Sequence, residues 1–499
     1  MPRLLLIALS ACLLTSAACF AQTITFPAYH KEDGKDIAFE ILGKVGKNYM
    51  VYKHLRSWKH VLQIFDLNMK EISNETMDYI SEKTKNADFI TYPDKFNMIY
   101  QYQKNGTLYC NAVMVDAEGK KIAGPVTLDT TRTGMNNDIY FTTYSEDKTK
   151  ILVYKVQERY SKITVVTKLY DQNFLLLDST RRMFAYDDRR EVYTDYQVDN
   201  DGNIVYAKEM KNGFRDNIDQ LEIITHAPRD SFATTAIPLY KTYIDELKIK
   251  IDNLNKTYLL NSFYYKDKMG TVLGLMAAVV KQKPVAVKVA FNPFADSLRN
   301  IIKTGEYRFA FNDFYLKNIF VKKDGSYIIA AEDKGTISRT SNLPYSRRDY
   351  LFNNAYTPGD YYYGSSSYYP YYRNDRYNVN TRYFYNNILI AGIDSNLNLK
   401  WNNIILKNQA EDNMDDFLSY GVLNTGSEIH FLFIDKEKNS QIISNHSLYA
   451  NGQVYRNPTV KSREAGYDFM PRHARQVGVR QVIVPSIYRG YLVFAKIDF

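Results

Sequence analysis

The seven histidines are the first residues to test for metal or general-base chemistry. No two of them stand in the H-E-x-x-H spacing that places zinc ligands on one face of a helix. His54 and His60 come nearest to a pair, because they flank a predicted hairpin and would converge if its strands pair. Histidines at a surface or rim are the more common outcome, so we expect exposed positions and predict no metal site.

An acidic run at residues 199–203, Asp-Asn-Asp-Gly-Asn, starts like a calcium-binding loop. The glutamate that completes such a loop is missing at its matching place. The same residue types also form tight turns, with the glycine at the position that needs a positive φ. We therefore interpret this run as a β-turn.

Motifs for nucleophilic or phosphate chemistry are absent from the sequence. It has no G-x-S-x-G elbow, and residues 43–47 contain two Gly-Lys pairs without the spacing of a phosphate loop. Paired carboxylates for glycoside cleavage would have to come from distant segments, such as Asp187, Asp188 or Glu191 meeting Asp415 or Asp416. We predict no catalytic residue, no cofactor and no metal from these patterns.

The clearest candidate for binding is a tyrosine-rich tract at residues 345–385, which also carries several arginines. Prolines, glycines and serines interrupt regular structure through most of it. Tyrosine offers a rigid surface with one polar tip, and arginine adds contacts to anions. A protein partner, a glycan or small molecule, and a low-complexity loop without a specific ligand all remain open. The predicted ligand-binding residues are Tyr361, Tyr362, Tyr363, Tyr368, Tyr369, Tyr371, Tyr372, Arg373 and Arg376.

The N-terminus predicts export. Residues 1–3 are positively charged, residues 4–14 are apolar, and small residues follow up to Ala21, which is the pattern of a signal peptide over residues 1–21. The alternative is a lipid anchor at Cys19, because Ser16-Ala17-Ala18-Cys19 resembles a bacterial lipobox. The expected location is periplasmic, cell-surface or secreted. Cys110 is then the lone thiol, expected to be buried and structural.

Composition narrows the class of partner. The formal net charge is +9, but no block of lysine and arginine marks a nucleic-acid stripe, so we expect no nucleic-acid partner. After the leader no run of 18 apolar residues is present, so we expect no transmembrane segment. The 44 tyrosines favour pleated β structure.

The elements that would position these residues are strands. Short apolar runs with period-two alternation recur along the chain, separated by turns rich in Asp, Asn and Gly. They group into about eight units of four strands, or alternatively seven, which predicts an all-β fold: a single β-propeller over residues 22–499. The last unit has three strands, and residues 23–26, or alternatively 37–42, would complete it by pairing the two chain ends. The tyrosine-rich tract is a loop insertion at residues 344–386 within one blade.

One blade carries a family resemblance. Asp324-Gly325-Ser326-Tyr327-Ile328-Ile329-Ala330-Ala331, followed by residues 388–394 and Leu397-Asn398-Leu399-Lys400-Trp401, resembles the blade repeat of secreted bacterial propeller proteins. In that repeat a "DGGY-I-V-A-G" strand precedes an "L-I-K-L-D-S-N-G-N-I-x-W" hairpin. Asp394 and Trp401 match it, while Leu397 stands in the place of the glycine. The resemblance implies an architecture but no reaction, because propeller families are functionally diverse.

The sequence therefore predicts an exported binding or scaffold propeller that recognises a protein or a cell-surface glycan on one face. The alternative is a propeller hydrolase or lyase acting on polysaccharide or peptide, which needs carboxylates or a carboxylate–histidine pair to converge near the axis of the ring. Oligomeric state is not predicted.

Overall fold

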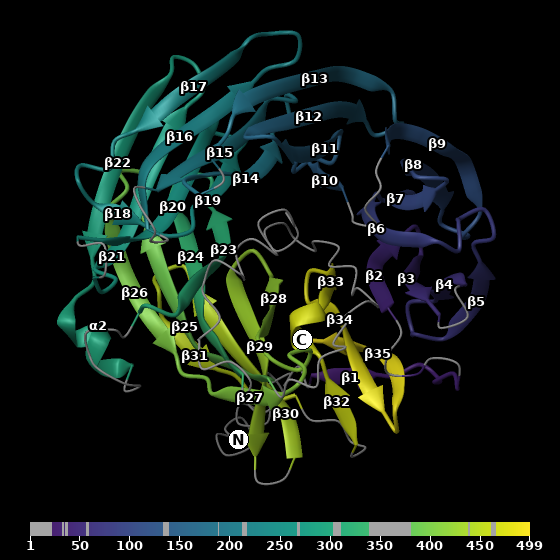
Figure 1. Cartoon of the computed structure of the whole chain (residues 1–499). Coiled ribbons are helices and arrows are strands. Elements are labelled where there is room, and N and C mark those ends of the chain that lie inside the picture. The colour runs from purple at the N-terminus through teal and green to yellow at the C-terminus, as the bar shows by residue number, and fades with distance from the viewer. Residues whose placement is uncertain are drawn as a thin grey trace, which may run out of the picture.

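The computed structural model describes residues 22–31, 34, 38–55, 59–132, 139–187, 189–211, 217–266, 270–302, 311–338, 381–437, 440–460 and 466–499. Within these residues the strands form seven antiparallel sheets. Figure 1 shows that the sheets follow one another around a ring, with the purple N-terminal strands beside the yellow C-terminal ones. The chain is an all-β propeller, as the sequence predicts.

Blades 1 to 4 each run outward from the axis in chain order (Figure 1). Blade 1 contains β2 (Ala38–Val45), β3 (Asn48–His54), β4 (His60–Phe65) and β5 (Glu71–Thr76), and blade 2 contains β6 (Thr84–Thr91), β7 (Lys95–Lys104), β8 (Thr107–Asp116) and β9 (Lys121–Arg132). Blade 3 contains β10 (Tyr140–Tyr144), β11 (Lys150–Arg159), β12 (Lys162–Asp171) and β13 (Leu176–Ala185). Blade 4 contains β14 (Glu191–Val198), β15 (Ile204–Lys211), β16 (Ile218–His226) and β17 (Phe232–Ile237).

Blades 5 to 8 complete the ring. Blade 5 contains β19 (Lys248–Asp252), β20 (Thr257–Tyr265), β21 (Gly274–Lys281) and β22 (Ala286–Pro293), and α2 (Asp296–Ile301) follows it as a linker. Blade 6 contains β23 (Phe314–Val321), β24 (Tyr327–Ser338), β25 (Thr381–Ile393), β26 (Leu399–Ile405) and β27 (Gln409–Asp412). Blade 7 contains β28 (Tyr420–Asn424), β29 (Glu428–Glu437), β30 (Ser440–Tyr449) and β31 (Val454–Arg456), and blade 8 contains β32 (Tyr467–Phe469), η3 (Pro471–His473), β33 (Arg475–Gly478), β34 (Gln481–Tyr488) and β35 (Tyr491–Asp498).

The blade count is eight because one sheet contains two blades. The nine-stranded sheet joins the four strands of blade 4 to those of blade 5 through the short strand β18 (Tyr243–Ile244). Ile244 pairs with Ile218 on one side and with Tyr264 on the other. Alternation cannot predict β18, since two residues are too few to show it.

The ring closes between the two ends of the chain. β1 (Thr23–Thr25) pairs antiparallel with β35, with Thr23 opposite Asp498 and Ile24 opposite Ile497. Residues 23–26 were one of two candidates for this role, and the other lies mostly in β2, the inner strand of blade 1. Closure pairs an edge of the last sheet that would otherwise be open to aggregation.

The turn of the matched blade explains how leucine replaces the glycine of the repeat. The carboxylate of Asp394 accepts hydrogen bonds from the backbone of Asn396 at 2.9 Å and of Asn398 at 2.8 Å. Leu397 has φ 70° and is 1% exposed, and Met69 holds the same place in blade 1 with φ 61° and 1% exposure. Burial of an apolar side chain between blades offsets the cost of the left-handed backbone.

Trp401, the second matched residue, is held between two glycines. A Cβ on Gly392 would lie 2.3 Å from the indole ring, and one on Gly452 of blade 7 would lie 2.4 Å from it. The ring therefore packs directly on backbone of its own blade and of the next one. Both positions exclude any larger residue without a shift of the tryptophan.

The fold confirms that Cys110 is buried. Cys110 is a free thiol and is 1% exposed, and burial raises the pKa of its thiol, which makes it a structural residue. No helix in the described ranges is long and apolar enough to cross a membrane. Residues 1–21, including Cys19, lie outside the described residues.

Candidate functional site

One face of the ring carries the turns between the second and third strands of each blade and the linkers to the next blade; we call it the linker face. In blade 6 the connection between β24 and β25 starts on this face. The described part of that connection ends at Ser338 and resumes at Thr381, which pair with one another. The tyrosine-rich tract is thus attached to the linker face at two neighbouring residues.

The two strands that carry the tract extend beyond the rest of their blade. β26 pairs with β25 as far as Ile388, and β27 then takes over with Tyr385 opposite Gln409 and Arg382 opposite Asp412. We call the resulting three-stranded unit, residues 334–338, 381–385 and 409–412, the stem. Its aromatic and β-branched residues suit a pleated, half-buried surface.

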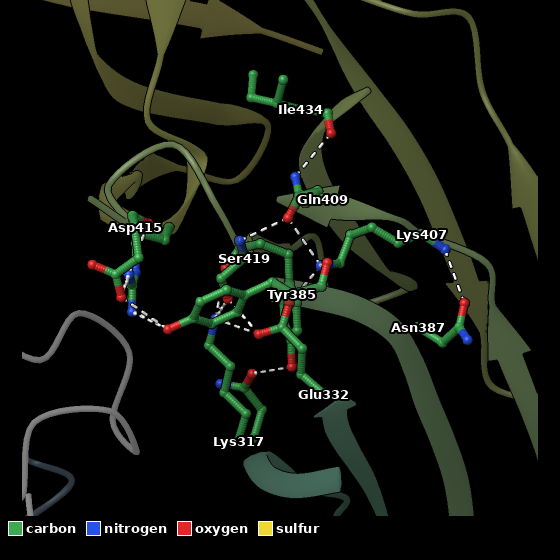
Figure 2. A network of polar contacts seen from close by, with 12 residues as sticks. Lys317, Glu332, Tyr385, Asn387, Lys407, Gln409, Asp415, Ser419 and Ile434 are labelled. Carbon is green, nitrogen blue, oxygen red and sulfur yellow. Dashed lines mark hydrogen bonds and ion pairs between the residues drawn. The ribbon is translucent and has the colours of Figure 1, made fainter. Parts of the chain in front are cut away.

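A buried ion pair lies at the base of the stem (Figure 2). Lys407 Nζ is 2.8 Å from Glu332 Oε1, and the two side chains are 1% and 3% exposed. Lys317 Nζ lies 3.8 Å from the other oxygen of Glu332, which also accepts a 2.5 Å hydrogen bond from the hydroxyl of Ser419. Burial by itself would raise the pKa of Glu332, but the charges of Lys407 and Lys317 outweigh it and hold the pKa below its usual range.

Gln409 connects this ion pair to blade 7. Its side-chain oxygen accepts hydrogen bonds from Lys407 Nζ at 3.0 Å and from the backbone N–H of Ser419 at 2.8 Å. Its side-chain nitrogen donates to the carbonyl of Ile434 in β29 at 2.8 Å. A cavity of about 280 Å³ lies beside these residues, between Asn387 and Lys407 of blade 6 and Ile434 of blade 7.

Tyr385 connects the stem to blade 8. Its hydroxyl donates to Asp415 Oδ2 at 2.9 Å, and the same oxygen is 2.8 Å from Arg472 Nη1 in η3. The guanidinium of Arg472 lies 5.3 Å from the centre of the Tyr385 ring. Figure 2 shows Tyr385 beside the ion pair, with its hydroxyl toward Asp415. The stem is therefore fixed to blades 7 and 8 as well as to its own blade.

The chemistry of this network is structural. Glu332, Lys407 and Gln409 are each buried and each already bonded to other side chains of the network. Glu332 and Lys407 are held by their ion pair and by the hydrogen bonds of Ser419 to Glu332 and of Lys407 to Gln409. The arrangement fixes the position of the strands that carry the tract.

The predicted ligand-binding residues of the tract, from Tyr361 to Arg376, lie outside the described residues. The predicted end of the tract is corrected by the structure, because Tyr383 and Tyr385 belong to β25, which starts at Thr381 and not at Asn387 as expected. Their aromatic character was attributed to the tract although it equally favours a strand. Sequence reasoning also missed Glu332, Lys407 and Gln409, which have no motif.

The proposed carboxylate pairs have different partners in the structure. Glu191 forms an ion pair with Lys208 at 2.8 Å, and Asp187 lies 3.8 Å from Arg190. Asp415 is bound to Tyr385 and Arg472 as described, and Asp188 lies outside the described residues. The interactions in which these groups take part are those of structural ion pairs.

The two histidines of blade 1 do converge, and the expectation of exposed positions is wrong. His54 and His60 pair across β3 and β4, their ring centres are 4.5 Å apart, and they are 3% and 2% exposed. Burial lowers the pKa of His60 to about 4, so the ring is neutral near pH 7. Among the described residues no group of three or more His, Cys, Asp or Glu side chains is placed to hold a metal ion.

The acidic run at residues 199–203 is a turn, as interpreted. Asp199 Oδ1 accepts hydrogen bonds from the backbone of Asp201 at 2.9 Å and of Asn203 at 2.8 Å, and Gly202 has φ 91°. Asp201 forms an ion pair with Lys256 of blade 5.

Comparison with known proteins adds no family. No family model and no curated protein matches the sequence. Among solved structures, the WD40 domain of SCAP from fission yeast is 11% identical, with a TM-score of 0.41 over 96% of this chain and 98% of that one. The β-propeller domain of the Trilobed protease from Pyrococcus furiosus is 9% identical, with a TM-score of 0.37 over 83% and 95%. The polysaccharide lyase Uly1 is 7% identical, with a TM-score of 0.38 over 82% and 89%.

These similarities are too low to carry an argument about function. The propeller assignment follows from the strand order and from the closure of β1 on β35. That fold agrees with the resemblance of blade 6 to a propeller repeat.

Proposed function

We propose that the chain is an exported β-propeller that binds a protein or a cell-surface glycan. In this proposal the tyrosine-rich tract contacts the ligand, and the stem holds the two ends of the tract in a fixed position. The observation that carries this proposal is the buried ion pair of Glu332 and Lys407 at the base of the stem. A buried ion pair is costly to desolvate and demands one geometry. Such a fixed base suits a loop that must present a surface in a defined place.

The composition of the tract supports the same proposal. Residues 361–372 include seven tyrosines, and Arg373 and Arg376 follow. Tyrosine contributes large contact area with few rotatable bonds, and arginine binds carboxylate or sulfate groups. Protein surfaces and acidic glycans both present such groups.

The experiment removes the tract and keeps the stem. Ser338 and Thr381 are paired, so an Asn-Gly linker can replace residues 339–380 as a two-residue hairpin turn. We expect unchanged thermal unfolding and loss of partner capture, measured by cross-linking pull-down from cell envelopes and on a glycan array. The deletion must stop at residue 380, because Tyr385 belongs to the network.

A matched variant separates contact from folding. Replacing the seven tyrosines of residues 361–372 with serine keeps the length of the tract and removes its aromatic surface. Capture by this variant at the level of the unaltered protein would contradict the proposed role of the tract.

Export is part of the proposal and has its own measurement. Mass spectrometry of the N-terminal peptide from the native host distinguishes a free chain starting at Gln22 from a lipidated chain starting at Cys19. An intact Met1 on the whole population would contradict export.

A second candidate function, a hydrolase or lyase, is favoured by one observation. Glu40 on β2, an inner strand of the ring, has a pKa raised to about 8 by burial, with Arg475 and Asp88 nearby. A carboxylic acid that keeps its proton at neutral pH is suited to general-acid catalysis. Release of reducing ends or new amino termini from polysaccharide or peptide libraries, abolished in Glu40→Gln, would establish this function.

A further inference from the structure

A second and separate site lies between blades 1 and 2. A cavity of about 580 Å³ opens there on the linker face, between the connection of β5 to β6 and the strands β7 and β8. Its volume is in the range of pockets that hold a small molecule or a short oligomer. The residues that matter for its chemistry are Tyr79, Lys83, Tyr100, Tyr102, Lys104 and Asn111.

One wall of the cavity is an aromatic strip on blade 2. Tyr100 and Tyr102 are two residues apart on β7, so their side chains point to the same face of the sheet. Across the strand pair, Asn111 lies opposite Tyr100, and Tyr109 lies opposite Tyr102. The rings of Tyr102 and Tyr109 stack with centres 5.2 Å apart and planes 11° apart. The result is a flat, half-exposed aromatic platform.

The opposite wall is the connection between the two blades, and the buried histidine holds it. His60 Nε2 is 3.0 Å from the carbonyl of Ser81, and His60 Nδ1 is 2.6 Å from the hydroxyl of Tyr52. Because the ring is neutral, it can donate from Nε2 to Ser81 while Nδ1 accepts from Tyr52. The position of Tyr79 and Lys83 is thus set from inside blade 1.

Two polar atoms of the cavity residues have nothing to bind. The hydroxyl of Tyr79 and the side-chain oxygen of Asn111 are buried, and neither has a hydrogen-bond partner in the part of the chain that the structure describes. Asn111 as a residue is 7% exposed. An unsatisfied buried polar group costs about 1–3 kcal/mol, so native proteins fill such positions with water or a ligand.

Two lysines and one glutamate line the cavity, and Asp78 and Asp116 lie near Tyr79 outside that lining. Lys83 and Lys104 are exposed lining residues, and Lys121 Nζ lies 5.2 Å from the centre of the Tyr79 ring. Glu82 is the one acidic residue that lines the cavity. Burial raises the pKa of Tyr79 and of Tyr100, so both phenols stay protonated and act as neutral hydrogen-bonding groups.

We propose that this cavity binds an acidic saccharide, a short stretch of a uronate-containing glycan. The C–H face of a sugar ring stacks on Tyr102, as apolar faces of rings do on aromatic side chains. Sugar hydroxyls complete the hydrogen bonds of Tyr79 and Asn111. Lys83 and Lys104 pair with the uronate carboxylate, which gives the preference for acidic over neutral sugars.

The test compares two probes of equal length by isothermal titration calorimetry, tetragalacturonate and maltotetraose, with the full chain. We expect tetragalacturonate to bind at least tenfold more tightly, with an affinity that falls as salt is raised. Tyr102→Ala should weaken binding at least tenfold. The double variant Lys83→Gln with Lys104→Gln should remove the preference for the acidic probe, and both lysines are exposed enough to be replaced without unfolding the chain.

The matched control is Tyr160→Ala in the turn between β11 and β12, because Tyr160 is on the same face and 84% exposed. It should bind like the unaltered protein. The variant without residues 339–380 should also bind normally, so failure of this proposal and failure of the tract proposal are distinguishable. Equal affinity for both probes, binding unaffected by Tyr102→Ala, or no heat with millimolar tetragalacturonate would overturn the proposal, as would tighter binding of ATP than of tetragalacturonate.

Discussion

Two boundaries between blades contain similar polar residues but differ in how those residues are paired. At the boundary of blades 6 and 7, an ion pair and a hydrogen bond join Lys407 to Glu332 and Gln409 in a buried network. At the boundary of blades 1 and 2, Asn111 and Tyr79 retain buried polar atoms without partners, beside an open cavity. Polar groups that bond to one another hold the blades in one arrangement. Polar groups without a partner beside a cavity are available to bind a ligand.

The lysines show the same contrast. The side chain of Lys407 is 1% exposed and is 2.8 Å from a carboxylate. Lys83 and Lys104 are exposed at the rim of their cavity, in contact with water. An exposed lysine attracts an anion without a desolvation cost to folding, while a buried lysine demands its partner in every molecule.

The largest expected effect is the loss of the buried lysine. Lys407→Met leaves Glu332 with only the more distant Lys317, and we expect a loss of about 3–5 kcal/mol of unfolding free energy. Lys104→Met at the rim of the cavity should change it by less than about 0.5 kcal/mol. Urea denaturation followed by tyrosine fluorescence measures both. The double variant Glu332→Gln with Lys407→Met should recover part of the lost unfolding free energy. Equal losses for Lys407→Met and Lys104→Met would contradict the difference between the buried and the exposed lysine.

A third boundary, between blades 4 and 5, gives an effect that depends on pH. Burial, together with the nearby Glu246 carboxylate, raises the pKa of Glu209 to about 8, and Glu209 accepts hydrogen bonds from Thr194 and from the backbone of Leu247. Because the folded state holds the proton more tightly, its stabilising contribution is complete below the ordinary pKa of a glutamate. It is lost as pH rises through about 8.

We therefore expect the unfolding free energy to fall between pH 5 and pH 9 by on the order of 4 kcal/mol because of Glu209. Glu209→Gln mimics the protonated form and should flatten this part of the profile. Glu332 has the opposite sign: its pKa is lowered, so its contribution is present at neutral pH and is lost in acid. Thermal unfolding at a series of pH values measures both, and an unchanged slope in Glu209→Gln would contradict the assignment.

The smallest expected difference in stability is that between replacing Gln409 and replacing Asn111, which lines the cavity between blades 1 and 2. Gln409→Leu removes hydrogen bonds to Lys407, Ser419 and Ile434, and we expect a loss of about 1–3 kcal/mol. Asn111→Leu removes an oxygen that has no partner among the described residues and one hydrogen bond to Tyr100, and we expect a change of about 1 kcal/mol. Chemical denaturation of the two variants side by side makes the comparison. If Asn111→Leu were as damaging as Gln409→Leu, the oxygen of Asn111 would be satisfied in the free protein.

Much of the fold could be predicted because its signals are local. Alternation along Val493, Ala495 and Ile497 marks the last strand, and the Asp-led turn at Asp394 follows from the hydrogen bonds that Asp makes to its own backbone. A count of strands shows the last unit to be one short and leaves residues 23–26 or 37–42 as the missing strand; the structure pairs residues 23–25 with β35. The site was less predictable, since Glu332 and Lys407 are separated by the whole tract.

The sequence by itself determined a ring of four-stranded sheets, because the side-chain period of a strand and the chemistry of a turn depend on neighbouring residues only. The tertiary structure alone decided which polar residues became buried partners and which were left beside a cavity. His60 meeting Ser81, and Gln409 meeting Ile434, require blades and linkers to be packed against one another first. Such contacts join segments whose separation along the chain carries no periodic signal, so they emerge when the ring closes.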